Sequence, residues 1–217
     1  MSLQSSEDRK EQSRLAARQF VLVGTVAEAG LGITGLVGGW LLGIPIREYV
    51  QWELSDVGKG LVATLPMLFI LGLVEFAPGR AFRRLRALVD LLIAPLIRSV
   101  PVPELGLVSL AAGLGEEVFF RGLVQGALVQ VLPVEGLVLG MPWEGPFLAI
   151  LLASLVFGLA HPLSSFYVVL TTIMGIYLGI LFHWSGNLLI PIVAHAVYDF
   201  VALVYLARYR RRGSPGS

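Results

Sequence analysis

The chain has 217 residues, of which 56% are hydrophobic and 14% are charged, and so little polar surface cannot cover a water-soluble globule. These proportions predict an integral membrane protein. Sixteen Lys and Arg residues against 15 Asp and Glu residues give a net charge of +1, which argues against nucleic acid as a partner. The absence of cysteine from the sequence excludes thiol catalysis, iron–sulfur clusters, Cys-ligated zinc and disulfides.

The apolar runs predict an all-α fold, a polytopic transmembrane bundle of about six to eight helices, because each crossing takes about 20 residues. Residues 1–19 are polar and of mixed charge, which predicts a cytoplasmic amphipathic segment without a signal peptide. The bundle is expected at 20–207 and a basic cytoplasmic tail at 208–217. Six runs are expected to cross the membrane fully: 20–42, 61–76, 105–132, 146–160, 166–182 and 188–206.

Charged residues in the connections predict which side of the membrane each end of the bundle faces. Arginines cluster at 80–86 and at 208–212, which predicts that both segments are cytoplasmic. The segment 134–145 is acidic and has no basic residue, so it is expected outside. Six crossings place both arginine clusters in the cytoplasm and 134–145 outside. This count requires the short segment 85–97, with Asp90 and Pro95, to be interfacial or re-entrant. A break of the 105–132 run near Gly113 and Gly115 keeps the same sides, and the sequence leaves both layouts open.

Ionisable residues inside membrane spans are costly, so each one is a functional candidate. Glu28 has no obvious partner and is expected to be a boundary or protonated residue. Glu117 and Arg121 are spaced i,i+4 with the acid first, which favours an ion pair within one helix. Glu116 is turned about 100° away from Glu117, so it lacks a local counter-charge. Glu116 is therefore a candidate general base, and the alternative is an interhelical salt bridge that only holds the bundle together.

Two of the three histidines lie in or at the end of apolar runs. His161 follows the 146–160 run, and His195 lies inside the last run with Asp199 one helical turn later on the same face. One membrane histidine alone would usually be a packed core residue. Two histidines on separate helices, together with Asp199 and the unpaired Glu116, instead predict a convergent polar site.

These residues form three spaced motifs on successive helices. Glu116, Glu117 and Arg121 fit an EExxxR motif; Phe157 and His161 fit FxxxH; and His195 and Asp199 fit HxxxN/D. In this combination the chain resembles the CPBP family of intramembrane CAAX proteases and bacteriocin-processing enzymes, also called the ABI family. The resemblance covers 105–206, about half of the chain.

The resemblance implies a glutamic intramembrane endopeptidase that acts on membrane-associated or CAAX-type peptides and proteins, with or without a prenyl group. Glu116 would be the base that activates a water together with His161, and His195 with Asp199 would line the oxyanion side. Glu117, Arg121 and Phe157 would support the site. An ionised Asp199 only accepts hydrogen bonds, so it must either be protonated or orient a cationic His195.

The sequence also leaves other mechanisms and functions open. No cofactor or metal is expected, but two histidines and a glutamate could hold zinc. A His-Glu-x-x-His motif is absent, as are the sequence contexts of aspartyl and serine intramembrane proteases. A membrane scaffold or bacteriocin-immunity protein remains a second functional class, and a proton-coupled transporter is a third. The location is expected to be a bacterial or archaeal inner membrane; lipid is a partner, and the oligomeric state is open.

Overall fold

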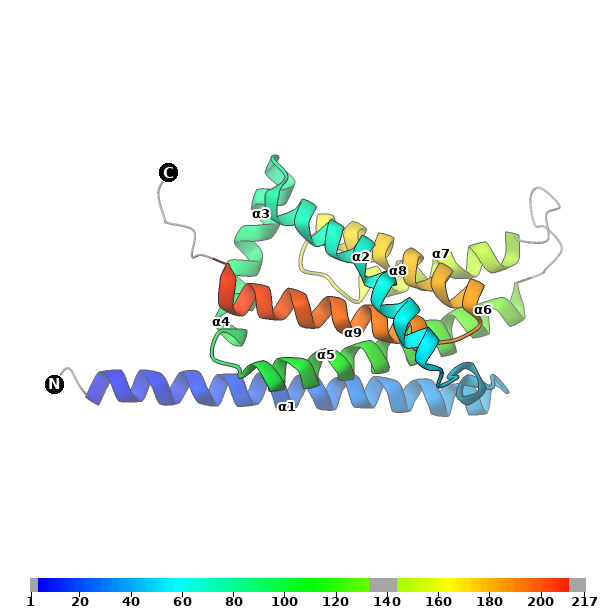
Figure 1. Cartoon of the computed structure of the whole chain (residues 1–217), viewed down its shortest axis with the longest axis horizontal. Helices are drawn as coiled ribbons and strands as arrows, with labels where there is room; N and C mark the ends of the chain where they lie inside the picture. The colour runs from blue at the N-terminus through cyan, green and yellow to red at the C-terminus, as the bar shows by residue number, and fades with distance from the viewer. Residues whose placement is uncertain (1–3, 133–143, 211–217) are drawn as a thin grey trace.

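The computed structural model describes residues 4–132 and 144–210, and those residues form an all-α fold (Figure 1). Most of the predicted outer segment 134–145 and most of the predicted tail 208–217 lie outside the described residues. The elements in chain order are α1 (Gln4–Leu41), the 3-10 helix η1 (Ile46–Tyr49), α2 (Leu54–Phe76), α3 (Arg80–Leu88), the π-helix η2 (Val89–Ile93), α4 (Ala94–Ile97), α5 (Val102–Glu117), the π-helix η3 (Val118–Gln125), α6 (Gly126–Val131), α7 (Glu144–Leu159), α8 (Ser165–Ser185), α9 (Leu189–Val204) and the π-helix η4 (Tyr205–Tyr209).

Four of the described helical segments are long and apolar enough to cross a membrane, so the protein is a multi-pass membrane protein. These segments are Glu11–Leu41, Leu54–Phe76, Ser165–Ser185 and Leu189–Tyr209. The predicted six full spans are therefore corrected to four, or to five when a bent helix pair is counted as one span. The run at 146–160 is not counted because the described part of α7 has 16 residues, roughly 24 Å of helix against a hydrocarbon core of about 30 Å.

The segment predicted to be interfacial or re-entrant forms α3, η2 and α4. This segment, Arg80–Ile97, meets the following helical segment, Val102–Val131, at an angle of 114°, as in a broken span or a re-entrant loop. Pro101 precedes the first residue of α5 and stays in an extended conformation (φ −59°, ψ 146°), which a helix cannot continue through. Because of this bend, α3 runs across the direction of α1, α5 and α9 (Figure 1).

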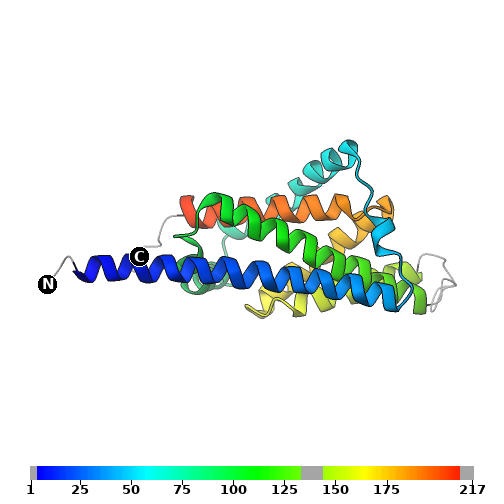
Figure 2. The same ribbon diagram turned by 90° about the horizontal axis from the view of Figure 1, so that it is seen from below.

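α9 lies at the centre of the packing, between α2 on one side and α5 on the other. α1 packs along the far side of α5, and α7 pairs with α8 (Figures 1 and 2). α1 and α5 touch backbone to backbone, because a Cβ atom at Gly115 would collide with the carbonyl oxygen of Glu28. Glycine at this position is therefore required for α1 to approach the helix that carries Glu116.

Exposed tryptophans and arginines lie in opposite halves of the bundle. Trp40 ends α1, Trp52 precedes α2 and Trp184 ends α8, and their side chains are 76 to 83% exposed. The N-terminus of α1, the Arg80 end of α3 and the Arg208 end of η4 lie in the other half of the bundle, apart from one another (Figure 1). Tryptophan favours membrane interfaces, and basic residues favour the cytoplasmic side. This arrangement supports the predicted sidedness, which remains a prediction.

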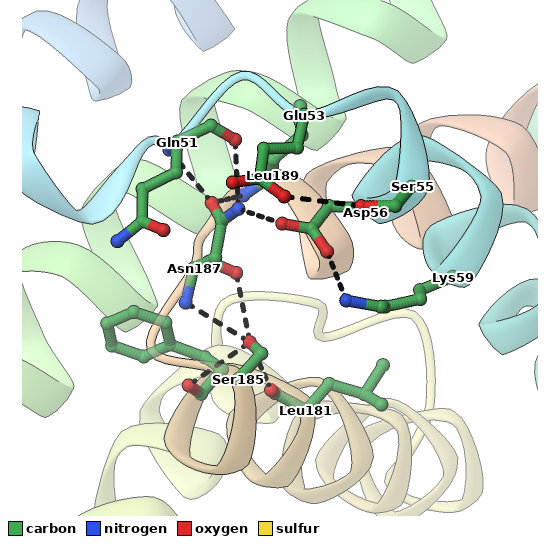
Figure 3. Close-up of polar contacts among 10 residues, drawn as sticks. Gln51, Glu53, Ser55, Asp56, Lys59, Leu181, Ser185, Asn187 and Leu189 are labelled. Atoms are coloured by element: carbon green, nitrogen blue, oxygen red, sulfur yellow. Dashed lines mark hydrogen bonds and ion pairs between the residues drawn. The ribbon is translucent and has the colours of Figure 1, made fainter.

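At the tryptophan end, Asn187 ties the turn before α9 to the start of α2 (Figure 3). Its Oδ1 accepts hydrogen bonds from the backbone N–H groups of Gln51 (3.0 Å) and Leu189 (2.9 Å). Its Nδ2 donates to the Gln51 carbonyl (2.9 Å) and to Asp56 Oδ2 (2.8 Å). Lys59 Nζ donates to the other oxygen of Asp56 (2.5 Å). Each polar atom of the buried amide is thus satisfied, which fixes the register of α9 and of the residues that it carries.

Candidate active site

The structure brings the three sequence motifs together from three parts of the fold. Glu116 is at the C-terminal end of α5, His161 is in the turn between α7 and α8, and His195 and Asp199 are on α9. Glu116 and His195 are buried, with 8% and 5% of their surface exposed. Buried ionisable groups inside a membrane protein mark functional sites by default.

The Glu116 carboxylate lies between the two imidazole rings. Its Oε1 is 3.8 Å from His161 Nε2, and its Oε2 is 4.0 Å from His195 Nε2. Both distances exceed a direct hydrogen bond and are short enough for a water molecule to bridge each pair. Glu116 Oε2 has no hydrogen-bond partner among the described protein atoms, so this oxygen is free to accept a proton.

His161 is held by the helix that precedes it. Its Nδ1 is 2.8 Å from the carbonyl oxygen of Phe157, one turn earlier. Since a carbonyl only accepts, Nδ1 carries the hydrogen and Nε2 faces Glu116 with a lone pair. Burial lowers the pKa of His161 below 6.5, so its neutral form persists to a lower pH than that of a free histidine.

His195 is oriented by Glu117, to which the family resemblance gave only a supporting role. Its Nδ1 is 2.8 Å from Glu117 Oε1, so Nδ1–H donates to this carboxylate. Nε2 then faces the site, 3.6 Å from Asp199 Oδ2 and 4.0 Å from Glu116 Oε2. Three carboxylates around one buried imidazole favour its protonated form, in which Nε2 is also a donor.

Glu117 and Arg121 form the predicted ion pair, with Arg121 Nε 3.1 Å from Glu117 Oε2. Both side chains are completely buried. Arg121 Nη2 also donates to the carbonyl of Gly175 on α8 (3.0 Å), and its guanidinium lies 4.5 Å from the centre of the Phe157 ring. Gly175, Arg121, Glu117 and His195 thus form one connected chain across α8, η3, α5 and α9.

The site opens into an elongated cavity of about 580 Å³ with mainly apolar walls. Glu116, His161, His195 and Asp199 line one part of it, and Arg210 lines another. Because 15 residues of α9 and η4 separate His195 from Arg210, the cavity runs for roughly 22 Å along this helix.

An ionic cluster lies at the Arg210 end of the cavity. Arg210 Nε is 3.6 Å from Glu75 Oε2 at the end of α2 and 3.4 Å from Asp90 Oδ1 in η2. Asp90, which the sequence placed in an interfacial or re-entrant segment, is partly exposed and joins this cluster.

Three contributions were not predicted from the sequence. Glu28, which had no obvious partner in the sequence, lies with its backbone against Gly115, the residue before Glu116. It is the one charged residue between Arg18 and Arg47, and this isolation in the sequence was the available signal. The bond from His195 to Glu117 and the position of Tyr167 in the cavity wall depend on tertiary packing, which no local spacing reveals.

Two histidines and one glutamate, His161, His195 and Glu116, are the residues that the zinc alternative requires. In the described residues, 4–132 and 144–210, no three His, Asp or Glu side chains are placed so that they could hold a metal ion. His161 and His195 each use Nδ1 in a hydrogen bond within the protein.

Comparison with known proteins identifies the part of the chain that carries the site. Residues 98–201 match the family model described as type II CAAX prenyl endopeptidase Rce1-like. No curated protein and no solved structure matches the chain. The matched residues include Glu116, His161, His195 and Asp199, and both members of the Glu117–Arg121 pair. Residues 98–201 therefore form a domain of the Rce1-like type II CAAX prenyl endopeptidase family, which belongs to the CPBP proteins.

Proposed function

We propose that the protein is an intramembrane endopeptidase that hydrolyses peptide bonds of membrane-associated or CAAX-type substrates with a Glu/His-activated water. Family membership suggests a peptidase and implies a protein substrate. One observation carries the proposed mechanism: Glu116 lies 3.8 to 4.0 Å from two imidazole Nε2 atoms at the wall of an elongated cavity. A base, a localised water and hydrogen-bond donors are the requirements of amide hydrolysis.

In this mechanism Glu116 takes one proton from the water as its oxygen attacks the peptide carbonyl carbon. His161, whose Nε2 lone pair faces Glu116, holds the same water in position. The C–N bond then breaks, and the proton on Glu116 passes to the leaving nitrogen, so that the carboxylate is regenerated. The products are a new carboxyl end and a new amine; the water supplies the added oxygen and hydrogen of the carboxyl group and the added hydrogen of the amine.

Asp199 supports the cationic form of His195 in this mechanism. The sequence left two roles open, a protonated Asp199 or an ionised Asp199 that orients His195. The 3.6 Å separation between Asp199 Oδ2 and His195 Nε2 favours the second role, because a carboxylate attracts and orients an imidazolium. His195 Nε2–H is then the donor from this helix to the oxygen of the attacked carbonyl.

The substrate is proposed to be a membrane-associated peptide or protein that reaches Glu116 through the cavity. Its mainly apolar walls suit an apolar peptide segment or an attached prenyl chain. The arginine-rich ends of α3 and η4 are proposed to face the cytoplasm of a bacterial or archaeal host, with both chain termini on that side.

Cleavage by the purified protein in liposomes tests this function. Membrane-anchored peptides, made with and without a prenyl group, should be cut at one internal bond. A strong chelator should leave the rate unchanged within about twofold, because the mechanism uses no metal. The absence of cleavage across such a panel would instead support a scaffold or immunity role. Loss of activity with the chelator, together with bound zinc by elemental analysis, would support the zinc mechanism.

A further inference from the structure

The proposed reaction needs more hydrogen-bond donors than Asp199 and His195 supply. The carbonyl oxygen of the substrate becomes an oxyanion when water attacks, and preorganised donors stabilise that charge. An ionised Asp199 only accepts hydrogen bonds. His195 supplies one donor, Nε2–H, which it shares with Asp199 at 3.6 Å. A second donor should therefore come from another cavity-lining side chain.

Most of the donors that line the cavity are committed elsewhere. Nδ1–H of His161 donates to Phe157. The hydroxyl of Thr171 donates to the carbonyl oxygens of Tyr167 and Val168 at 2.9 and 3.1 Å. Arg210 is paired with two carboxylates at the other end of the cavity. The cavity wall then retains two further hydroxyls, those of Tyr167 and Tyr198.

Tyr167 is the better placed of the two tyrosines. It lies in the first turn of α8, and its ring is edge-on to His161 with 6.4 Å between the ring centres. Tyr198 packs instead against the hydrophobic cluster that includes Met67 and Met174. Within residues 11–132 and 145–210, the Tyr167 hydroxyl makes no hydrogen bond to a protein atom.

The local sequence explains why Tyr167 is held at this position. Ser164 Oγ accepts a hydrogen bond from the backbone N–H of Tyr167 (3.1 Å), which caps the start of α8. Ser164 lies three residues after His161, so this cap fixes the first turn of α8 close to the site. Tyr167 is therefore positioned by the backbone, and its hydroxyl is left free for a ligand.

We infer that the Tyr167 hydroxyl donates a hydrogen bond to the oxyanion of the tetrahedral intermediate and is a catalytic residue of this site. The inference rests on the proposed peptidase function. The hydroxyl keeps its proton throughout, because it stabilises the charge by donation and transfers nothing. Together with His195 Nε2–H it completes a two-donor oxyanion site, while Asp199 keeps His195 charged.

Tyr167→Phe tests this role, with Tyr177→Phe as the matched control on the same helix. Tyr177 is outside the cavity wall, and its hydroxyl donates to the carbonyl of Ala63 (2.8 Å). With a peptide that the wild-type protein cleaves, Tyr167→Phe should lower kcat roughly 10²-fold and leave KM within about twofold. Tyr177→Phe should retain the wild-type kcat.

Binding of a peptide phosphonate gives a readout that does not depend on turnover. The tetrahedral phosphonate imitates the oxyanion, so its affinity should fall in Tyr167→Phe by a factor similar to the loss in kcat. Affinity for the uncleaved peptide, measured on Glu116→Gln with and without Tyr167→Phe, should be unchanged. An unchanged kcat in Tyr167→Phe, or the same loss in Tyr198→Phe alone, would overturn the assignment. Wild-type cleavage, measured first, tests the proposed function separately.

Discussion

Glu116→Gln should reduce kcat/KM for peptide cleavage by roughly 10³-fold, within the range that a general base contributes. Glutamine has nearly the same volume as glutamate, and it can turn its amide N–H toward the lone pair of His161 Nε2 and its carbonyl oxygen toward His195 Nε2–H. It cannot take a proton from water at neutral pH. The loss should therefore appear in turnover, without a change in the folded state. Steady-state kinetics on membrane-anchored peptides in liposomes measure it.

Glu104→Gln is the matched control for this substitution. Glu104 lies in the first turn of the same helix, α5, 12 residues and roughly 18 Å from Glu116. It does not line the cavity, so its replacement should leave kcat/KM within about twofold of wild type. Retention of more than a tenth of the activity by Glu116→Gln would exclude Glu116 as the base.

Arg121→Met should lower the free energy of unfolding more than the other single substitutions proposed for this site. Arg121 and Glu117 are both fully buried, and removal of one partner leaves the other charge unpaired in an apolar interior. Such a change costs about 3–5 kcal/mol in the free energy of unfolding. Denaturation in mixed micelles, followed by circular dichroism, measures this loss. Because Glu117 also orients His195 through a 2.8 Å bond, activity should fall as well.

A double substitution separates these two effects. Glu117→Gln with Arg121→Met removes both buried charges, and replacing a whole buried ion pair by neutral groups is often close to neutral for stability. The double variant should therefore regain most of the lost stability. Its activity should stay low, since a neutral amide stabilises the cationic His195 less than a carboxylate does. Arg121→Met that costs less than about 1 kcal/mol would contradict this account of the pair.

Local spacing in the sequence was enough to predict the contacts within one helix. Glu117 and Arg121 are four residues apart and form an ion pair at 3.1 Å, and His195 and Asp199 approach to 3.6 Å at the same spacing. A helix places residues four apart on one face whatever surrounds it. The order of the motifs also indicated that Glu116, His161 and His195 come from different parts of the fold, although His161 lies in the turn after α7 and not within a helix.

Contacts between distant segments could not be predicted in this way. The bond from His195 to Glu117 joins residues 78 positions apart, and the cavity position of Tyr167 depends on how α8 packs against α9. Hydropathy also treated every apolar run alike, although α7 is short and α5 continues at an angle of 114° from the helix before it. These features depend on packing geometry rather than on composition.

The central claim is that a water activated by Glu116 attacks the peptide carbonyl directly. One turnover in water enriched in oxygen-18, followed by mass spectrometry of both product and protein, tests this claim most directly. The account predicts one heavy oxygen in the new carboxyl end of the product and none in the Glu116 side chain. Heavy oxygen in Glu116 after this single turnover would show that its carboxylate had attacked the substrate as a nucleophile, and would contradict the mechanism.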